Sequence, residues 1–467
     1  MHSMKKESTQ AHTDVSRRNF IKTSALTGLG LAVAPGLSFG KGSKDDKVQI
    51  AFIGVGGRGR SHLNNILKRD DIIVTAICDI DQTAIDKTLN MIKKAGFKKP
   101  ESFSGSKTAY LDLLAREDID GVIIATPWVW HTKMAVDSMK AGKYAGVEVS
   151  AANTMAECWD LVNTYEETGV PTMILENVCY RRDVMAVLNM VRQDVFGELI
   201  HGRCGYRHDL RGVKFNPGVT FGKDANSEAR WRTQHSLVRN ADLYPTHGIG
   251  PIANMMNINR GNRFLSLTAH ATKARGLKDY IVNHAAGGPE HPNANINWKL
   301  GDVVTSTINT ANGETIIVTH DTNLPRPYSL NFEVQGVKGI TDFDYDHRRI
   351  YVEGTSKAHS WENMNKGEEG SPSWLEKYDH PLWEKYGDYA EGSGHGGMDF
   401  FVDNAFVESV KRKVNPPLDA YDAAAWSAIS PLSERSIAEG NAPQYFPDFT
   451  RGKWMWAKPN FALDDDY

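Results

Sequence analysis

The sequence predicts an α/β protein: a doubly wound parallel sheet of the Rossmann type, followed by an α+β domain with a mainly antiparallel sheet. Three observations support this prediction. A glycine-rich turn joins an apolar strand to a helix near residue 54, and strands alternate with helices from there to residue 175. Beyond that point, apolar segments follow one another without intervening helices, which indicates antiparallel pairing. A chain of 467 residues has room for two or three such domains.

Residues 1–45 are expected to form an export signal and linker rather than part of the fold. The string Ser16-Arg17-Arg18-Asn19-Phe20-Ile21-Lys22 has the form of a twin-arginine signal, and a mild apolar stretch follows up to Phe39. This stretch is too short and too rich in glycine for a membrane span. Because the twin-arginine route carries folded proteins, we expect a periplasmic or extracellular protein that acquires its nucleotide before export.

The glycine-rich turn has the spacing of a dinucleotide-binding fingerprint. Gly54, Gly56 and Gly59 form G-x-G-x-x-G between an apolar strand and a helix whose free N–H groups can face a pyrophosphate. Asp79 ends the next apolar run, 20 residues after Gly59. A carboxylate at that place binds the ribose 2′-hydroxyl and repels a 2′-phosphate, so NAD is expected rather than NADP. The alternative is a glycine-rich turn in some other α/β fold.

The nucleotide-binding domain is expected to span residues 46–176. Apolar periodicity predicts helices at residues 82–94, 109–116, 130–140 and 155–168, and buried strands at residues 120–126, 144–149 and 171–175.

The second domain is expected to span residues 177–467 and to bind the substrate. Its predicted strands are residues 199–206, 265–272, 303–309, 315–319 and 330–337, and its predicted helices are residues 184–194, 249–259, 399–411 and 421–439.

Polar and aromatic residues follow two strands of the predicted parallel sheet. Trp128, Val129, Trp130 and His131 come after the strand at 120–126, and Glu148 ends the next strand. Strand ends of this kind border the ligand crevice, so these side chains are expected to contact the cofactor. The alternative is that the two tryptophans only fill the domain interface.

Tyr180 follows the last strand and stands beside Arg181 and Arg182. Because a nearby guanidinium favours a phenolate, Tyr180 is a candidate acid or base. The alternative is a tyrosine at the domain junction with two surface arginines.

Polar loops of the second domain could hold a polyol. One such loop precedes a predicted helix and contains Tyr244, Pro245, Thr246 and His247. A second segment, His395-Gly396-Gly397-Met398-Asp399, resembles another loop that leads into a helix. Isolated histidines are usually structural, but the clustering of tyrosine, threonine and histidine in the first loop favours function.

The bulk composition gives no sign of nucleic-acid or metal binding. The net charge is −3, and the four cysteines are scattered without the spacing of a metal site. Homo-oligomer formation stays open.

At this point the chain resembles the superfamily of glucose–fructose oxidoreductase and inositol dehydrogenase. Ordinary members carry E-K-P where this chain has Glu148-Val149-Ser150, so the lysine that assists hydride transfer in them is missing here. The chain is more similar to glycoside hydrolase family 109, the NAD-dependent α-N-acetylgalactosaminidases. The strings PWVWH, GVEVS, ENVCYRRD, YRHDL, YPTHG, RPYSL and GHGGMD carry this resemblance in order along the chain.

The resemblance implies two sets of contacts. For NAD they are Gly57, Arg58, Asp79, Trp128, His131, Glu148, Val149 and Asn177, and for the sugar they are Tyr206, Arg232, Tyr244, Thr246, His247 and Tyr328.

The resemblance also implies the reaction. The sugar is oxidised at C3, the C2 proton is removed, the leaving group departs from C1, water adds, and C3 is reduced again. The substrate would be a glycan with a terminal N-acetylhexosamine, and Tyr180 and His247 are the candidate acid and base. Two alternatives remain open: an NAD-dependent sugar or polyol dehydrogenase, and a binding protein without turnover.

Overall fold

The computed structural model describes residues 47–215, 221, 225, 227–344, 347–367 and 369–467. The expected export signal at residues 1–45 lies outside these residues. None of the helices in the described ranges is long and apolar enough to cross a membrane.

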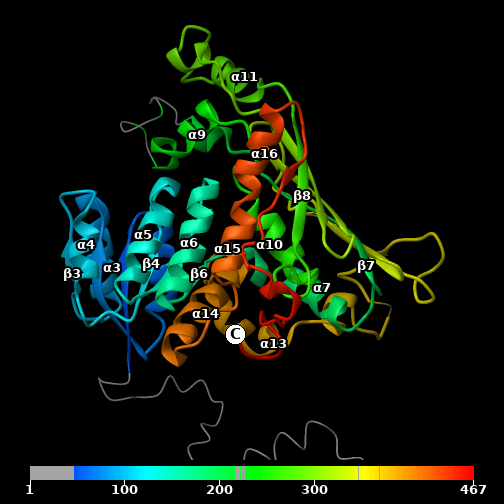
Figure 1. The fold of residues 1–467 in the computed structure, drawn as a ribbon, viewed down its shortest axis with the longest axis horizontal. Coiled ribbons are helices and arrows are strands. Elements are labelled where there is room, and N and C mark those ends of the chain that lie inside the picture. The colour runs from blue at the N-terminus through cyan, green and yellow to red at the C-terminus, as the bar shows by residue number, and fades with distance from the viewer. Residues whose placement is uncertain (1–46, 216–220, 222–224, 226, 345–346, 368) are drawn as a thin grey trace, which may run out of the picture.

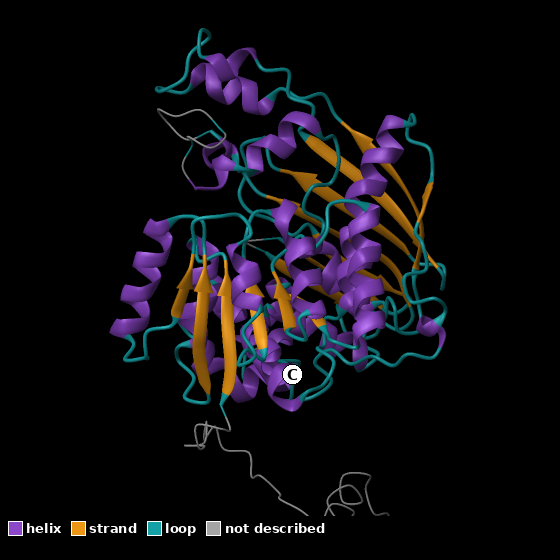
Figure 2. Cartoon of the chain, turned by 60° about the vertical axis from the view of Figure 1, so that its left-hand side comes forward, coloured by secondary structure: helices purple, strands orange, loops and turns teal. Residues whose placement is uncertain are grey.

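The first sheet has six parallel strands in the order β3-β2-β1-β4-β5-β6, with helices on both sides (Figure 2). Its strands are β1 (Val48–Ile53), β2 (Ile72–Cys78), β3 (Glu101–Phe103), β4 (Gly121–Ile124), β5 (Tyr144–Val147) and β6 (Thr172–Ile174). Its helices are α2 (Gly57–Ile66), α3 (Gln82–Lys94), α4 (Ala109–Leu114), α5 (Trp128–Lys140) and α6 (Met155–Thr168). Strand order and polarity confirm the predicted Rossmann-type sheet.

The second sheet has nine strands in the order β14-β13-β12-β11-β7-β10-β9-β8-β15. All its neighbouring strands are antiparallel except β7 and β10, which run parallel. The strands are β7 (Leu199–Arg207), β8 (Phe264–Ala271), β9 (Val303–Thr310), β10 (Thr315–Asp321), β11 (Phe332–Gly336), β12 (Gly339–Phe343), β13 (Arg348–Val352), β14 (Glu362–Asn363) and β15 (Gln444–Tyr445). The predicted mainly antiparallel sheet is thus confirmed.

Helices connect and cover the second sheet. They are η2 (Asn177–Tyr180), α7 (Arg182–Arg192), α8 (Arg211–Lys214), η3 (Ser227–Arg230), α9 (Arg232–Val238), α10 (Thr246–Met255), α11 (Gly276–Asn283), η4 (Pro292–Asn295), α12 (Trp374–Lys377), α13 (Pro381–Ala390), η5 (His395–Gly397), α14 (Met398–Arg412), α15 (Ala420–Ser427), α16 (Ile429–Ala438) and η6 (Lys453–Met455). Helix α10 packs on β7 and α16 packs on β8.

Helices α14 and α15 come from the C-terminal part of the chain but pack on the first sheet and its helices (Figure 1). Phe406 and Val410 of α14 lie against Gly121 and Gly146, where an added methyl group would stand 3.0 Å from their side chains. The expected boundary at residue 176 therefore separates the two sheets but does not apply to these helices.

The single helix expected at residues 421–439 is two helices, α15 and α16. Pro431 explains the break, because proline lacks an N–H and its ring clashes with the carbonyl four residues earlier. That residue is Ser427, the last residue of α15.

Candidate active site

The glycine turn after β1 fits a dinucleotide. An added Cβ at Gly59 would stand 2.0 Å from the carbonyl oxygen of Gly54, so α2 can begin this close to the strand only with glycine there. Gly56 and Gly57, by contrast, border open space, and no side chain caps the N-terminus of α2. Free N–H groups next to open space are what a pyrophosphate requires.

Asp79 lies at the end of β2, as the fingerprint predicts. Its carboxylate accepts hydrogen bonds from the backbone N–H of Val55 at 2.8 Å and of Asp81 at 2.9 Å. These bonds fix the carboxylate beside the glycine turn, which is the place expected for recognition of the ribose.

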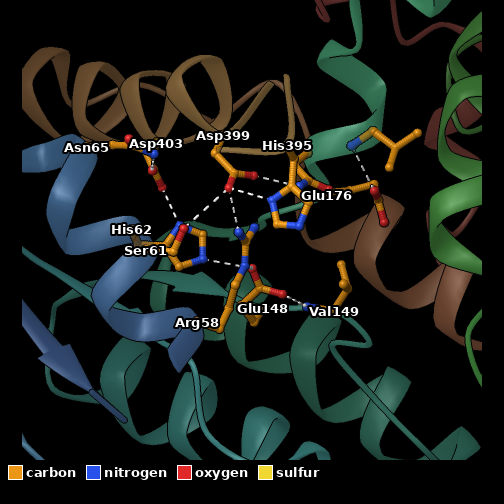
Figure 3. Close-up of polar contacts among 12 residues, drawn as sticks. Arg58, Ser61, His62, Asn65, Glu148, Val149, Glu176, His395, Asp399 and Asp403 are labelled. Carbon is orange, nitrogen blue, oxygen red and sulfur yellow. Dashed lines mark hydrogen bonds and ion pairs between the residues drawn. The ribbon is translucent and has the colours of Figure 1, made fainter. Parts of the chain in front are cut away.

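Arg58 and His62 project from one face of α2 toward Glu148, at the end of β5 (Figure 3). The Nε of Arg58 donates to Glu148 Oε1 at 2.6 Å, and the Nε2 of His62 donates to the same oxygen at 2.7 Å. The two cations hold the pKa of the buried Glu148 below its usual range, although burial alone would raise it. Glu148 is therefore an ionised carboxylate held in one position.

Helix α14 contributes two carboxylates to the same network (Figure 3). Asp399 accepts from Arg58 at 2.7 Å, from the Nδ2 of Asn177 at 2.6 Å, and from the Nδ1 of His395 at 2.8 Å. One turn later, Asp403 accepts from the Nδ1 of His62 and from Asn65. These contacts hold α14 against α2, next to the glycine turn.

His62 is fully buried between Asp403 and Glu148. Burial opposes its charge, but the two carboxylates outweigh burial and raise the pKa of His62 to about 9. An imidazolium has two N–H donors, one for each carboxylate.

The side-chain amide of Asn177 has a donor that is hydrogen-bonded and an oxygen that is not. Its Oδ1 is buried and has no hydrogen-bond partner in the described structure. An unpaired buried acceptor at the carboxyl end of the sheet fits a contact with the NAD carboxamide, because that group carries N–H donors. The position of Asn177 thus fits the cofactor.

His247, in the first turn of α10, is paired with Glu176. Its Nδ1 stands 2.7 Å from Glu176 Oε1, and Glu176 is fully buried. Because a carboxylate only accepts, Nδ1 carries the hydrogen, and Nε2 of a neutral ring is left with a lone pair. No partner among the described residues holds Nε2. Glu176 therefore fixes the orientation of the ring and leaves Nε2 available, and the acid–base role of His247 stays a prediction.

An aromatic cluster surrounds His247. The ring centroid of Tyr206 lies 5.4 Å from that of His247 and 4.7 Å from that of Tyr244. The ring centroid of Tyr328 lies 6.2 Å from that of Tyr206. The guanidinium of Arg232 stands 5.1 Å from the Tyr244 ring. The structure thus brings together the residues that the resemblance assigns to the sugar.

The loop before α10 completes this cluster. Pro245 precedes the first helical residue, Thr246, whose buried Oγ1 has no partner in the described structure. An added Cβ at Gly248 would stand 2.5 Å from the backbone nitrogen of Gly205 in β7. Glycine at that position therefore lets α10 approach the sheet closely enough to place His247 beside Tyr206.

The segment after β4 contributes residues near both the cofactor edge and the sugar-binding cluster. Trp128 packs 5.0 Å from Trp231 and 5.5 Å from Tyr244, so it lies with the sugar residues as well as at the cofactor edge. Val129 is exposed and Trp130 is half-buried on α5, whereas Val149 is buried beside Glu148.

The side chain of His131 is not free to bind a cofactor. It is buried, and its ring nitrogens lie 2.9 Å from the carbonyl oxygen of Ser150 and 2.6 Å from that of Thr126. A side-chain contact of His131 with NAD is therefore not supported. The ring instead joins the loops that follow β4 and β5.

The proposed acid–base role of Tyr180 is also not supported. Its side chain is fully buried between Phe401 and Phe461, and its hydroxyl has no partner in the described structure. The adjacent arginines bind Asp183 and Asp379 instead. Burial raises the pKa of the Tyr180 phenol well above its usual value, so the expected phenolate does not form.

Sequence reasoning missed several residues of the site. His62 and Asp403 carry no motif, and Glu176 and Asp399 stand in strings that were noted without a role for these two acids. A helical spacing could have indicated a shared face for Arg58, His62 and Asn65, because residues three or four apart are neighbours on a helix. Nothing local indicates their partners on α14.

The fold and the cofactor edge define the class first: this is an NAD-binding protein built like the sugar and polyol oxidoreductases. Residues 48–175 match the family model "Oxidoreductase family, NAD-binding Rossmann fold". Among solved structures, a levoglucosan dehydrogenase in complex with NADH and levoglucosan superposes with a TM-score of 0.64 at 18% identity, covering 86% of this chain and 100% of that one. At this identity the likeness concerns the fold alone.

The rest of the chain narrows the class to one family. Residues 180–456 match the model "Glycosyl hydrolase 109, C-terminal domain". The chain is 51% identical to an "Alpha-N-acetylgalactosaminidase" of Tannerella forsythia, over 96% of this chain and 99% of the relative. It is 48% identical to a "Glycosyl hydrolase family 109 protein" of Stenotrophomonas maltophilia, over 97% and 99%. The chain therefore belongs to glycosyl hydrolase family 109.

Proposed function

We propose that this chain is an exported glycosidase that removes terminal, α-linked N-acetylgalactosamine by a redox-assisted elimination. The relative from Tannerella forsythia supports the sugar. The observation that carries the mechanism is the Glu176–His247 pair, whose free Nε2 lies within the cluster of tyrosines and Arg232.

The carboxylates of the site support this choice of mechanism. Most glycosidases use two carboxyl groups that flank the scissile bond, one as acid and one as base or nucleophile. Here Glu148 is bound by Arg58 and His62, and Glu176 is bound by His247 and by the backbone N–H of Val178 at 3.0 Å. Both carboxylates are thus already engaged by side-chain or backbone N–H groups, which favours a reaction that does not need the pair.

Asp79 at the end of β2 and Asn177 after β6 would hold NAD at the edge of the first sheet, and the bound cofactor would supply reversible hydride transfer at C3 of the sugar. The C3 ketone acidifies the C2 hydrogen, which Nε2 of His247 is oriented to remove as a proton. Glu176 stabilises the imidazolium that forms. The leaving group then departs from C1, and water adds before C3 is reduced. Arg232 and the tyrosines hold the ring while these steps proceed.

A panel of aryl N-acetylhexosaminides of both anomers, with and without added NAD, tests the proposal. We expect release of the phenol from the α-N-acetylgalactosaminide without accumulation of NADH. A steady build-up of NADH with oxidised sugar would instead identify a dehydrogenase, and bound NAD without any turnover would identify a binding protein.

Export is tested separately, by mass spectrometry of the secreted protein. We expect the N-terminal segment to be absent from it.

A further inference from the structure

A small hollow adjoins the sugar-binding cluster. It is lined by Tyr206 and Arg232 of that cluster and also by Lys214, Ser236 and His320. In the parallel pairing of β7 and β10, His320 stands directly beside Tyr206, so both side chains leave the sheet on the same face. The hollow is therefore an extension of the cluster that faces the sugar.

Two polar atoms in this hollow lack partners. The hydroxyl of Ser236 and the Nδ1 of His320 are both buried, and neither has a hydrogen bond within the described structure. A buried polar group without a hydrogen bond destabilises the folded state. Both residues line the hollow, where a polar ligand could pair with these two groups.

Lys214 adds a positioned donor. It is 3% exposed, and its Nζ donates to Thr322 Oγ1 and to Asn323 Oδ1, each at 2.7 Å. An ammonium has three donors, so one is left over. Burial lowers the pKa of Lys214 to about 7, and no carboxylate of the described residues forms an ion pair with it, so an acceptor at the third N–H would favour the ammonium form. The group is thus expensive to bury and is not explained by a salt bridge.

The same hollow has apolar walls, formed by Leu210 and Leu243. The lining therefore combines the unused N–H of Lys214, the unpaired hydroxyl of Ser236 and Nδ1 of His320, and apolar surface. An acetamido group offers the complement: a carbonyl oxygen, an N–H and a methyl group. A hydroxyl offers neither the carbonyl oxygen nor the methyl group, and a carboxylate has neither the N–H nor the methyl group.

We propose that this hollow is the subsite for the 2-acetamido group of the sugar, with Lys214, Ser236 and His320 as the residues that distinguish an N-acetylated sugar from a plain one. This inference rests on the proposed function and specifies its substrate. Lys214 and His320 act on selectivity and not on the proton transfer assigned to His247.

The test compares matched substrates in Lys214→Met and Ser236→Ala. For each protein, kcat/KM is measured with an aryl α-N-acetylgalactosaminide and with the corresponding aryl α-galactoside, and Kd is measured for free N-acetylgalactosamine and free galactose. Lys278→Met is the control, because Lys278 is an exposed lysine of the same domain. Circular dichroism and bound NAD report whether each variant is folded.

We expect the wild type to prefer the N-acetylated partner in both measurements. Lys214→Met should reduce this preference by about 10- to 100-fold, mainly through KM, and Ser236→Ala by a smaller factor in the same direction. Lys278→Met should not change it. An unchanged preference in folded Lys214→Met and Ser236→Ala would overturn the subsite.

Failure of the proposed function has a different signature. A wild type that cleaves neither glycoside but binds N-acetylgalactosamine over galactose, with the preference lost in Lys214→Met, retains the subsite and refutes the glycosidase. A wild type that cleaves both glycosides equally well and binds both sugars alike refutes the subsite and retains the glycosidase.

Discussion

At the scale of single residues, the site depends on which polar groups are already occupied. Tyr180 and His247 are equally plausible from the sequence, since each stands in a polar segment next to a strand end or helix start. The structure separates them by partner and burial: the Tyr180 hydroxyl is enclosed by phenylalanines, whereas His247 is oriented by Glu176. Burial against a distant segment such as residues 398–412 cannot be seen in local sequence, and for that reason the prediction for Tyr180 was wrong.

His247→Ala should lower kcat on an aryl glycoside by about 10²- to 10⁴-fold, because a positioned acid or base is lost. Glu176→Gln should lower it less, since the amide oxygen can still accept from Nδ1 but no longer stabilises an imidazolium, and its pH–rate profile should shift. Bound NAD should stay at the wild-type level in both variants. His270→Ala, at an exposed position of β8, is the control. Normal turnover by His247→Ala would remove this residue from the mechanism.

Asp79→Ala should weaken NAD binding and reduce the discrimination against NADP, because both the ribose hydrogen bonds and the repelling charge are lost. Equilibrium binding of the two nucleotides to cofactor-stripped protein measures this directly. If affinity and preference both match the wild type, a different group recognises the ribose.

At the scale of secondary-structure elements, the sequence predicts the parallel strands and their helices well, because glycine turns and apolar runs are local signals. Helix α3, for example, has the expected bounds, Gln82–Lys94. The partners of α2 could not be predicted. Arg58 binds Asp399 and His62 binds Asp403, each across 341 residues of chain. Such pairs depend on how the C-terminal helix returns to the first sheet, and no local pattern encodes that.

The contacts between α2 and α14 should retain the cofactor. Asp399→Asn removes the charge that holds Arg58 and weakens the contact with Asn177. A lost hydrogen bond to a charged group is worth about 1.5–3 kcal/mol, so NAD should dissociate roughly tenfold faster or more. Release of NAD from purified holoprotein after dilution, followed by mass spectrometry, measures the rate. Asp388→Asn, an exposed aspartate of α13, is the control. Equal release rates for both variants and the wild type would contradict this role of α14.

At the scale of the whole molecule, the cofactor residues lie at the carboxyl ends of the first sheet, whereas the sugar residues lie on β7, on helices α9 and α10 and in the loops next to them. The buried network of His62, Glu148, Asp399 and Asp403 connects the two parts, so its ionisation should affect the stability of the entire chain. The pKa of His62 is raised to about 9 in the folded state, above the unfolded value of about 6.5. Its contribution is therefore complete below about pH 6.5 and is lost as pH rises through about 9.

The urea concentration at half-unfolding should accordingly fall between pH 7 and pH 9.5 in the wild type. In His62→Gln it should be lower at pH 7 and should fall less over the same interval, because no raised pKa remains at this position. A wild-type midpoint that is constant or rises with pH, or an equal decrease in the variant, would argue against a charged His62.

In the proposed reaction, the enzyme breaks the C2–H bond of its substrate during each turnover. Hydrolysis of an aryl α-N-acetylgalactosaminide in deuterated water, with the product examined by proton NMR, tests it most directly. Removal of the C2 proton by His247 and its replacement from solvent predict that deuterium appears at C2 of the released sugar, with no net NADH formed. Full retention of protium at C2 in a reaction that releases the phenol would contradict the elimination and indicate direct displacement at C1.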